Sequence, residues 1–332
     1  MQPKWPAPMH IGDYLQTCSL TLVAMRFELI LLGTNSALPA FGRFPSAQVL
    51  NVQENHYLID CGEGAQIRMD EFRVRRHKIK QIFISHLHGD HIYGLIGFLS
   101  SLSLSDRTAP MDIFAPLGLE EIIRVQLKYA GGLSFPLRFH TTDTEQHRLI
   151  FENASIEVYS LPLVHRAPAS GFLFKEKERP RSMKAEKIEA YHIPYSDIPA
   201  IKNGAGYKLP DGQFIFNEEL TWPPPAPRSY AYCSDTAYQE ALVPLIQGVD
   251  LLYHESTFCE DKREQAALTG HSTAHQAATI AKMAGAGQLA LGHYSSRYQN
   301  LEPFLKEARA VFPNTELGLD GKVFEVPLKK KL

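Results

Sequence analysis

The pattern of apolar and polar positions predicts short β-strands in the first part of the chain and helices between later strands. Glycine-containing turns follow at Gly33 and at 62–64, as expected for an open sheet. Residues 93–104 and 117–129 are apolar enough and long enough for helices. Runs of strand character cover residues 26–32, 46–52, 56–59 and 113–115. Strands that alternate with helices predict an α/β sandwich with helices on the outer faces.

Two segments depart from this pattern. Residues 1–24 contain prolines and a weak apolar run, without the basic start or cleavage site of a signal peptide. We expect them to be an N-terminal extension, either disordered or the product of a misassigned start, with the folded domain covering 25–332. Residues 172–216 combine a charged stretch with many turn residues. This segment is predicted to be an arm inserted into the domain.

A histidine-rich run follows the apolar residues 81–84. It reads Ser85-His86-Leu87-His88-Gly89-Asp90-His91 and holds three imidazoles and one carboxylate. Beyond a strand end, His86 and His88 point the same way and can share one ion, while Asp90 and His91 fall in the next turn and can face a second. Imidazole and carboxylate ligands suit zinc, manganese or iron, and the lack of cysteine argues against a structural zinc finger.

Three more candidate ligands each lie just past a predicted strand. His165 follows residues 156–164, Asp235 follows 229–234, and His293 follows 288–292. Strand ends are where α/β folds commonly assemble sites, because the rigid sheet presents loops there. With the first run they supply seven ligands, enough for two ions with Asp235 as a bridge. Two such ions can activate water and stabilise charge on a phosphoryl oxygen.

Charge, cysteine spacing and the length of apolar runs indicate the cellular compartment and the classes of partner that we expect. The formal net charge of −2 gives no global attraction to nucleic acid, so a polyanion would be held by local patches. The cysteines, Cys18, Cys61, Cys233 and Cys259, show no CxxC spacing. We therefore expect reduced thiols in a cytoplasmic protein. No run of about 20 apolar residues occurs, so no membrane partner is expected.

The pattern HxHxDH at residues 86–91 is the hallmark of the metallo-β-lactamase superfamily, which the chain resembles. More narrowly, it resembles the ribonuclease Z family of tRNA 3′-processing endoribonucleases, over about Met25 to Phe324. The resemblance implies a four-layer αββα sandwich with a protruding arm. Five further segments carry the narrower likeness: Leu32-Gly33-Thr34 with Pro39, Asp60-Cys61-Gly62-Glu63-Gly64, His254-Glu255-Ser256-Thr257-Phe258, His271-Ser272-Thr273 and His293-Tyr294-Ser295-Ser296-Arg297-Tyr298.

The resemblance also implies a ligand set. Two Zn²⁺ ions would bind per subunit, with Mn²⁺ or Fe²⁺ as substitutes. The first would be held by His86, His88 and His165, the second by Asp90, His91 and His293, with Asp235 between them. Asp90 would also orient or deprotonate the attacking water.

Two residues outside the ligand set resemble catalytic groups of the family. His271, at the start of a predicted helix over 273–284, resembles the general acid near the leaving oxygen. Glu255 would hydrogen-bond His271 and raise its pKa, which keeps it protonated. The hydroxyl of Ser272 is predicted to cap the helix that follows.

RNA contacts are expected from three places. Arg297, with Ser295 beside it, lies shortly after His293, and a guanidinium matches phosphate oxygens. Arg76 belongs to a basic run over 73–80 that leads into the histidine run and would border the cleft. The arm would grip the tRNA elbow, although the usual glycine-proline signature is replaced by residues 193–199.

The favoured function is a zinc-dependent endoribonuclease that removes the 3′ trailer from precursor tRNA and leaves a 3′-hydroxyl. A homodimer is implied, and no DNA partner is expected. The alternative within the same fold is a phosphodiesterase of small or cyclic nucleotide diesters, which a shrunken arm would favour. A di-iron redox enzyme would carry an acidic residue in the first cluster and a fused flavin domain. A catalytically silent RNA-binding protein would tolerate loss of ligands, whereas this set is intact.

Overall fold

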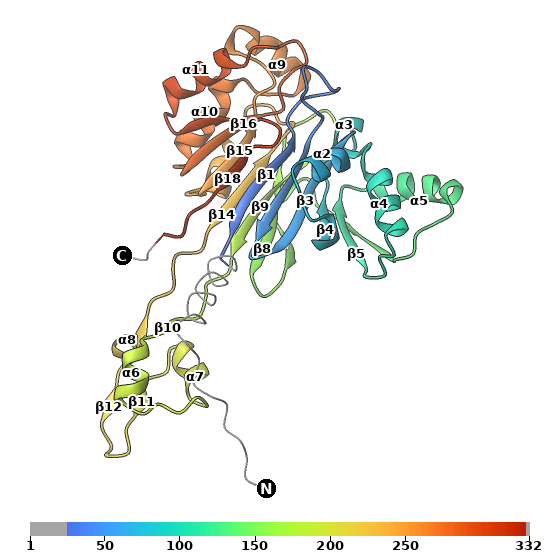
Figure 1. Cartoon of the computed structure of the whole chain (residues 1–332). Coiled ribbons are helices and arrows are strands. Elements are labelled where there is room, and N and C mark those ends of the chain that lie inside the picture. Colours follow the sequence, from blue (N-terminus) through green and yellow to red (C-terminus); the bar gives the residue numbers. More distant parts are fainter. Residues whose placement is uncertain (1–24, 330–332) are drawn as a thin grey trace. The chain divides into compact units, whose positions relative to one another are not determined.

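The structure is a computed structural model that describes residues 25–329, so the expected extension over 1–24 lies outside the described residues. Its larger compact unit contains two seven-stranded sheets. Figure 1 shows these two sheets packed against each other. The first sheet has the order β18 (Val323–Glu325), β1 (Phe27–Gly33), β2 (Ala47–Val52), β3 (Asn55–Cys61), β4 (Ile79–Phe83), β5 (Met111–Ala115) and β6 (Leu137–Thr141).

The second sheet is built from later strands. Its members β14, β15, β16 and β17 run parallel to one another, so the carboxyl ends of these strands lie at one edge. In sheet order the strands are β17 (Thr315–Leu317), β16 (Gln288–Gly292), β15 (Leu251–Glu255), β14 (Ser229–Cys233), β9 (Ser170–Glu176), β8 (Ile156–Pro162) and β7 (Leu149–Glu152).

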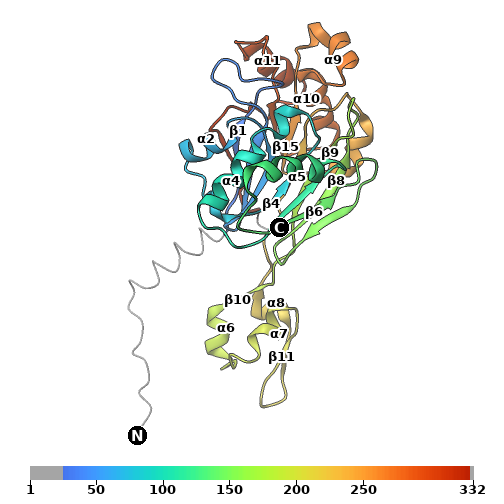
Figure 2. The same ribbon diagram turned by 90° about the vertical axis from the view of Figure 1, so that its right-hand side faces the viewer.

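Helices cover the outer face of each sheet (Figures 1 and 2). The first sheet is covered by α2 (Ala65–Glu71), α4 (Leu95–Leu104) and α5 (Leu119–Ala130). The second is covered by α10 (Ala274–Met283) and α11 (Glu302–Val311). The remaining short helices of this unit are α3 (Gly89–Ile92), α9 (Arg263–Thr269) and the 3₁₀ helices η1 (Arg76–Lys78), η2 (Glu240–Ile246) and η3 (Glu260–Lys262).

Side-chain alternation along the strands produces three apolar layers. On β1, Leu29 and Leu31 face the core between the sheets, whereas Leu32 faces the helices of the first sheet. On β14, Tyr230 and Tyr232 belong to the same inter-sheet core. The outer helices add one apolar layer on each side. The predicted four-layer αββα sandwich is therefore confirmed.

A second compact unit comprises residues 175–228 with 327–329. The sequence placed the insertion at about 172–216, whereas β9 continues to Glu176 and β14 begins at Ser229. Glu176 and Arg228, both buried, form an ion pair of 2.8 Å. The unit has its own small core of Ile193, Ile201, Ile215 and Leu220. Its elements are β10 (Ser182–Met183), α6 (Ala185–Ala190), α7 (Ile198–Lys202), β11 (Tyr207–Lys208), β12 (Phe214–Ile215), α8 (Asn217–Leu220) and β13 (Thr221–Trp222).

Two further observations concern membrane-spanning helices and cysteines. Within residues 25–329, no helix combines the length and the apolar character needed to cross a bilayer. Cys61, Cys233 and Cys259 are buried and free, as predicted, and Cys18 lies outside the described residues.

Candidate active site

The predicted metal ligands all lie just beyond strand ends. The loop after β4 carries the first two, and α3, which begins at Gly89, carries the next two. The loops after β8, β14 and β16 carry the remaining three. Because each of these strands is held by its ladder and by an apolar layer, its loop starts from a rigid position. The fold thus brings together His86, His88, Asp90, His91, His165, Asp235 and His293.

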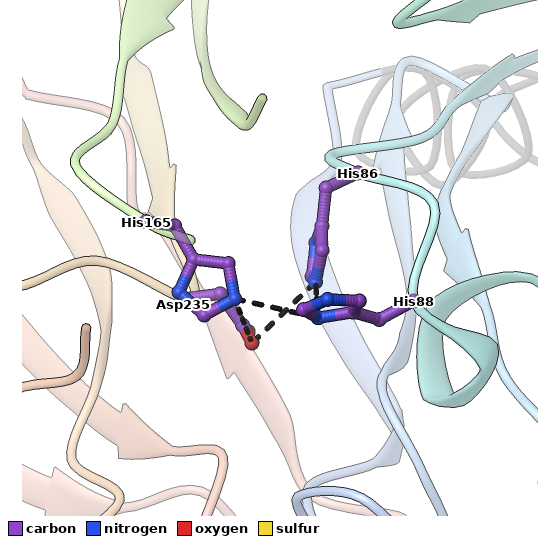
Figure 3. Close-up of side chains that lie close together, drawn as sticks. All are labelled: His86, His88, His165 and Asp235. Carbon is purple, nitrogen blue, oxygen red and sulfur yellow. Dashed lines mark hydrogen bonds and ion pairs between the residues drawn. The ribbon is translucent and has the colours of Figure 1, made fainter. Parts of the chain in front are cut away.

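The first group consists of His86, His88, His165 and Asp235 (Figure 3). Nδ1 of His88 lies 2.9 Å from Nε2 of His86 and 3.3 Å from Nε2 of His165. Oδ2 of Asp235 lies 3.6 Å and 3.7 Å from the same two Nε2 atoms. Ligand atoms of a tetrahedral zinc site are about 3.3 Å apart. Burial lowers the pKa of His86 and of His165, which favours the neutral imidazole that a metal needs.

The second group consists of Asp90, His91 and His293, with Asp235 beside it. Oδ1 of Asp235 lies 3.2 Å from Nε2 of His91 and 3.1 Å from Nε2 of His293. Oδ2 of Asp90 lies 3.6 Å from both nitrogens. Asp235 therefore turns one oxygen to each group, which is the arrangement required of a carboxylate that bridges two cations.

Two buried ring nitrogens without a hydrogen-bond partner indicate that a cation fits this second group. Nε2 of His91 and Nε2 of His293 are buried, and neither forms a hydrogen bond to another described residue. The opposite ring nitrogens are occupied: Nδ1 of His91 donates to Asp60 at 2.7 Å, and Nδ1 of His293 lies 3.0 Å from the hydroxyl oxygen of Thr257. Thr257 donates its own proton to Glu255, so it accepts from His293. Both Nε2 lone pairs are therefore available, and the residues fit a divalent cation.

Backbone strain marks the same strand ends. Asp60, Asp235 and His293 have φ of 53°, 57° and 58°, in the left-handed region that L-residues rarely adopt. Each such residue costs about 1–3 kcal/mol unless its surroundings hold it. Here the hydrogen bonds and ion pairs of the three side chains hold this conformation. It directs Asp235 and His293 into the site and Asp60 toward His91.

The charges of the cluster are strongly coupled. Burial opposes a positive charge on His91, yet the carboxylates of Asp235, Asp60 and Asp90 raise its pKa well above the usual range. Burial likewise opposes a negative charge on Asp235, yet His293 and His91 hold its pKa well below the usual range. The carboxylates of this site therefore attract positive charge, which protons or divalent cations can supply.

The predicted contact between His271 and Glu255 is present. Nδ1 of His271 lies 2.8 Å from Oε1 of Glu255, a fully buried carboxylate. Burial would lower the pKa of His271, but the charge of Glu255 and this hydrogen bond raise it to about 9. The ring of His271 lies 5.4 Å from that of His293 and 5.2 Å from that of His165, beside both groups. Its position is also close enough to Asp235 for it to be a possible ligand.

The prediction that Ser272 caps the next helix is wrong. Thr273 caps α10: its hydroxyl accepts from the backbone of Gln276 at 3.2 Å, and the side chain of Gln276 accepts from the backbone of Thr273. Ser272 is buried and donates to the carbonyl of Thr236 at 2.7 Å. It therefore ties the segment of His271 to the loop that carries Asp235.

The predicted phosphate-binding residues lie on a ligand-bearing loop. Arg297 is exposed, four residues beyond His293, and its backbone N–H donates to the hydroxyl of the buried Ser295. Exposure leaves the guanidinium of Arg297 accessible to a phosphate.

Arg76 lies elsewhere. It is in η1, which precedes β4, whereas His86 follows the other end of that strand. A five-residue strand is about 17 Å long. The guanidinium of Arg76 pairs with Asp70 at 3.3 Å. The expectation that this basic run borders the active cleft is therefore wrong for Arg76. The run leads into β4, whereas the histidines follow it.

The sequence missed three groups that hold the ligands. Asp60 accepts from His91, Thr257 accepts from His293, and the backbone N–H of Ala37 donates to Oδ2 of Asp90 at 2.8 Å. Asp60 directly follows a predicted strand, the signal that found Asp235, so the same rule would have included it. The contact of Ala37 uses only backbone and leaves no trace in the sequence.

Known proteins were compared with this chain and its fold. A family model described as "Anti-Pycsar protein Apyc1" matches residues 27–177, less than half of the chain. The structure of the short form of human tRNase Z (ELAC1) aligns with a TM-score of 0.66 and 26% identity, over 90% of this chain and 99% of that one. The metallo-beta-lactamase fold protein YhfI from Bacillus subtilis aligns with a TM-score of 0.63 at 19% identity, over 90% and 99%, a likeness of fold alone.

Curated relatives are much closer in sequence. Ribonuclease Z of Bacteroides fragilis is 45% identical over 297 residues, which cover 89% of this chain and 98% of the relative. Ribonuclease Z of Porphyromonas gingivalis (strain W83) is 46% identical over 290 residues, which cover 87% and 95%. With this identity, and with clusters of histidine and aspartate suited to metal binding, the chain belongs to the ribonuclease Z family and is a metal-dependent endoribonuclease of the metallo-β-lactamase fold.

Proposed function

We propose that this endoribonuclease removes the 3′ trailer from precursor tRNA by two-metal phosphodiester hydrolysis and leaves a 3′-hydroxyl. The observation that carries the proposal is Asp235, whose two oxygens face two separate ligand groups. A protonated His271 beside both groups supplies an acid where a leaving oxygen would depart. The relatives named ribonuclease Z support tRNA as the substrate class.

Two Zn²⁺ ions, with Mn²⁺ or Fe²⁺ as substitutes, fit the nitrogen and oxygen ligands. His86, His88 and His165 would hold one ion, Asp90, His91 and His293 the other, with Asp235 between them. When bound, the ions would activate water and stabilise negative charge on the phosphoryl oxygens.

The chain's own residues do the rest of the chemistry. Asp90, held by the N–H of Ala37, orients or deprotonates the attacking water. His271 donates a proton from its ring to the leaving oxygen, and Glu255 keeps that ring charged. Arg297 and Ser295 bind phosphate oxygens next to the cut.

The second unit is proposed to be the arm that grips the tRNA. It contains a hollow of about 370 Å³ lined by Arg179, Arg181 and Lys202 together with the acidic Glu178, and Arg179 also pairs with Glu176 at 2.6 Å. Three cationic side chains around one hollow suit contact with a phosphate backbone, which does not require a base sequence. This basic lining supports the role although the glycine-proline signature is absent.

The assembly and the compartment are proposed from the family resemblance. We expect a homodimer in the cytoplasm, with RNA and not DNA as its partner. Light scattering from the purified full-length chain would report the mass of the assembly, and a monomer at micromolar concentration would contradict the dimer.

Substrate choice tests the function most directly. The purified protein should remove the trailer from a precursor tRNA and should leave cyclic nucleotides and small diesters nearly untouched. Gel analysis of the RNA, end-group analysis for the 3′-hydroxyl, chromatography of the nucleotides and measurement of bound metal check this. Efficient turnover of cyclic nucleotides without trailer removal would establish the alternative phosphodiesterase and end the tRNA proposal.

Glu255→Gln should change the pH dependence of cleavage. In the wild type, His271 is protonated below about pH 9, so activity should fall as pH rises through that value. Without the carboxylate, burial opposes the charge and Asp235 and Asp90 still favour it, so the pKa of His271 should fall back toward roughly 6.5, its ordinary value. The basic limb of the kcat/KM profile should therefore move down by about 2 pH units or more.

The control for this shift is Glu260→Gln. Glu260 accepts from the hydroxyl of Thr273, close to His271 in sequence, but does not bond the histidine. The basic limb of the kcat/KM profile of Glu260→Gln should stay near pH 9. If the kcat/KM profile of Glu255→Gln were the same as that of the wild type, Glu255 would not have the proposed role.

A further inference from the structure

A fully buried carboxylate outside the predicted site holds one of the ligands. Oδ1 of Asp60 accepts from the backbone N–H of Ser85 at 2.7 Å. Oδ2 accepts from the hydroxyl of Ser85 at 2.8 Å, from Nδ1 of His91 at 2.7 Å and from the phenol of Tyr232 at 2.6 Å. Asp60 thus receives four hydrogen bonds, of which the last is the shortest.

The four donors come from different parts of the fold. Ser85 and His91 follow β4, the neighbour of β3 in the first sheet, where Asp60 lies. Tyr232 lies on β14 of the second sheet and is 1% exposed, within the inter-sheet core. Its hydroxyl is therefore the one described donor that reaches Asp60 from the opposite sheet.

Tyr232 also lies three residues before Asp235 on the same strand and its loop. The phenol consequently ties the strand that delivers Asp235 to the carboxylate that orients His91. These two ligands have to stay in register, because Oδ1 of Asp235 and Nε2 of His91 lie 3.2 Å apart, a distance that suits one shared cation. A small shift between the sheets would lengthen the distance between Oδ1 of Asp235 and Nε2 of His91.

The ring of Tyr232 is itself fixed in place. It stacks on Tyr253 of β15, with ring centroids 5.3 Å apart and planes inclined by 22°. A phenol held by its ring can set the direction of a lone pair on Asp60, and Asp60 in turn sets the plane and the tautomer of His91. The oxygen of Tyr232 therefore influences a metal ligand through two hydrogen bonds without contacting the metal site.

We propose that Tyr232 is a positioning residue for the second ion, acting through Asp60 and His91; this inference rests on the proposed two-metal function. Loss of its hydroxyl has two opposing effects. Asp60 becomes a stronger acceptor for His91, which makes Nε2 slightly more basic. The imidazole also loses a hydrogen-bonded link to the second sheet, which leaves the bond from the backbone N–H of Ser170 to the carbonyl of Ser85 as a link that remains. We expect this loss of geometry to outweigh the small gain in basicity.

The test compares Tyr232→Phe with Tyr230→Phe in the full-length protein. Tyr230 is equally buried on the same strand, but its hydroxyl donates to Gln48 and does not reach the ligands. Both variants lose one buried hydroxyl, so the melting temperatures of the two metal-free variants should fall by similar amounts. Zinc affinities are measured by competition with a chromophoric chelator, which resolves the two binding steps.

Tyr232→Phe should weaken the binding of one of the two ions about tenfold, the lower end of the effect of outer ligand partners. The other ion, and both ions of Tyr230→Phe, should change by less than about twofold. As a second readout at limiting zinc, the ¹⁵N signals of the His91 ring should show one metal-bound Nε2 state in the wild type and a mixture of metal-bound and metal-free states in Tyr232→Phe. Equal affinities in all three proteins, or equal weakening in both variants, would overturn the inference.

This experiment is separable from the test of the proposed function, because it reads metal binding and not RNA cleavage. A wild-type protein that binds two ions but leaves precursor tRNA intact would end the tRNA proposal and leave the comparison of affinities valid. A wild-type protein that binds a single ion would overturn both the two-metal mechanism and the role of Tyr232 in it.

Discussion

His271→Ala is expected to lower the turnover of precursor tRNA at least a hundredfold while both metal ions remain bound. The expected loss follows from the role of a general acid, which contributes about 10²–10⁴-fold. The seven proposed ligands do not include His271, and its Nδ1 is engaged by Glu255. Single-turnover cleavage assays together with elemental analysis of the purified protein measure the two quantities independently.

The matched control is His275→Ala. His275 lies four residues further along, exposed on α10, and its loss should change neither turnover nor metal content. A His271→Ala protein that has lost an ion would show that His271 is a ligand, as its distance from Asp235 and His293 permits, and would overturn its role as an acid.

Asp235→Asn should remove most activity by a different route, through the metals. Each oxygen of Asp235 faces one ligand group, so an amide, which carries no charge and only one acceptor oxygen, can serve a single group at most. We expect bound zinc to fall from two ions to one or fewer and cleavage to drop at least about a hundredfold. Elemental analysis and calorimetric titration with zinc measure the stoichiometry.

Asp250→Asn provides the control, because Asp250 accepts from Ser229 at the other end of β14. It should keep two ions and near wild-type activity. Full occupancy of two ions in Asp235→Asn would show that this carboxylate does not bridge, and the two-metal mechanism would then need another link between the groups.

Much of the secondary structure could be predicted because it depends on local pattern. The expected helix over 117–129 is α5 (Leu119–Ala130), and the one over 273–284 is α10 (Ala274–Met283). The expected helix over 93–104 is α4 (Leu95–Leu104). It begins two residues later than expected, just after Gly94, which lies against the backbone of Gly62, where a side chain would clash. That approach joins distant segments, so no local pattern reveals it.

The errors at polar residues have the same origin. Ser272 and Thr273 are both hydroxyl residues at a helix start, and which of them caps is decided by the contact of Ser272 with Thr236. Arg76 is close to His86 in sequence, yet a strand separates them. Sequence distance is a poor guide to spatial distance wherever an extended segment intervenes.

Residue type and position after predicted strands were sufficient to select the seven candidate ligands, because imidazoles and carboxylates at strand ends carry their chemistry wherever the sheet is built. The pairing of these residues into two groups, with Asp235 between them, was implied by the family resemblance, and the distances within each group needed the folded structure. So did the contacts of Asp60 with His91 and Tyr232, which join residues 31 and 172 positions apart. Such contacts depend on how two sheets pack, and that packing is a property of the whole core rather than of any segment.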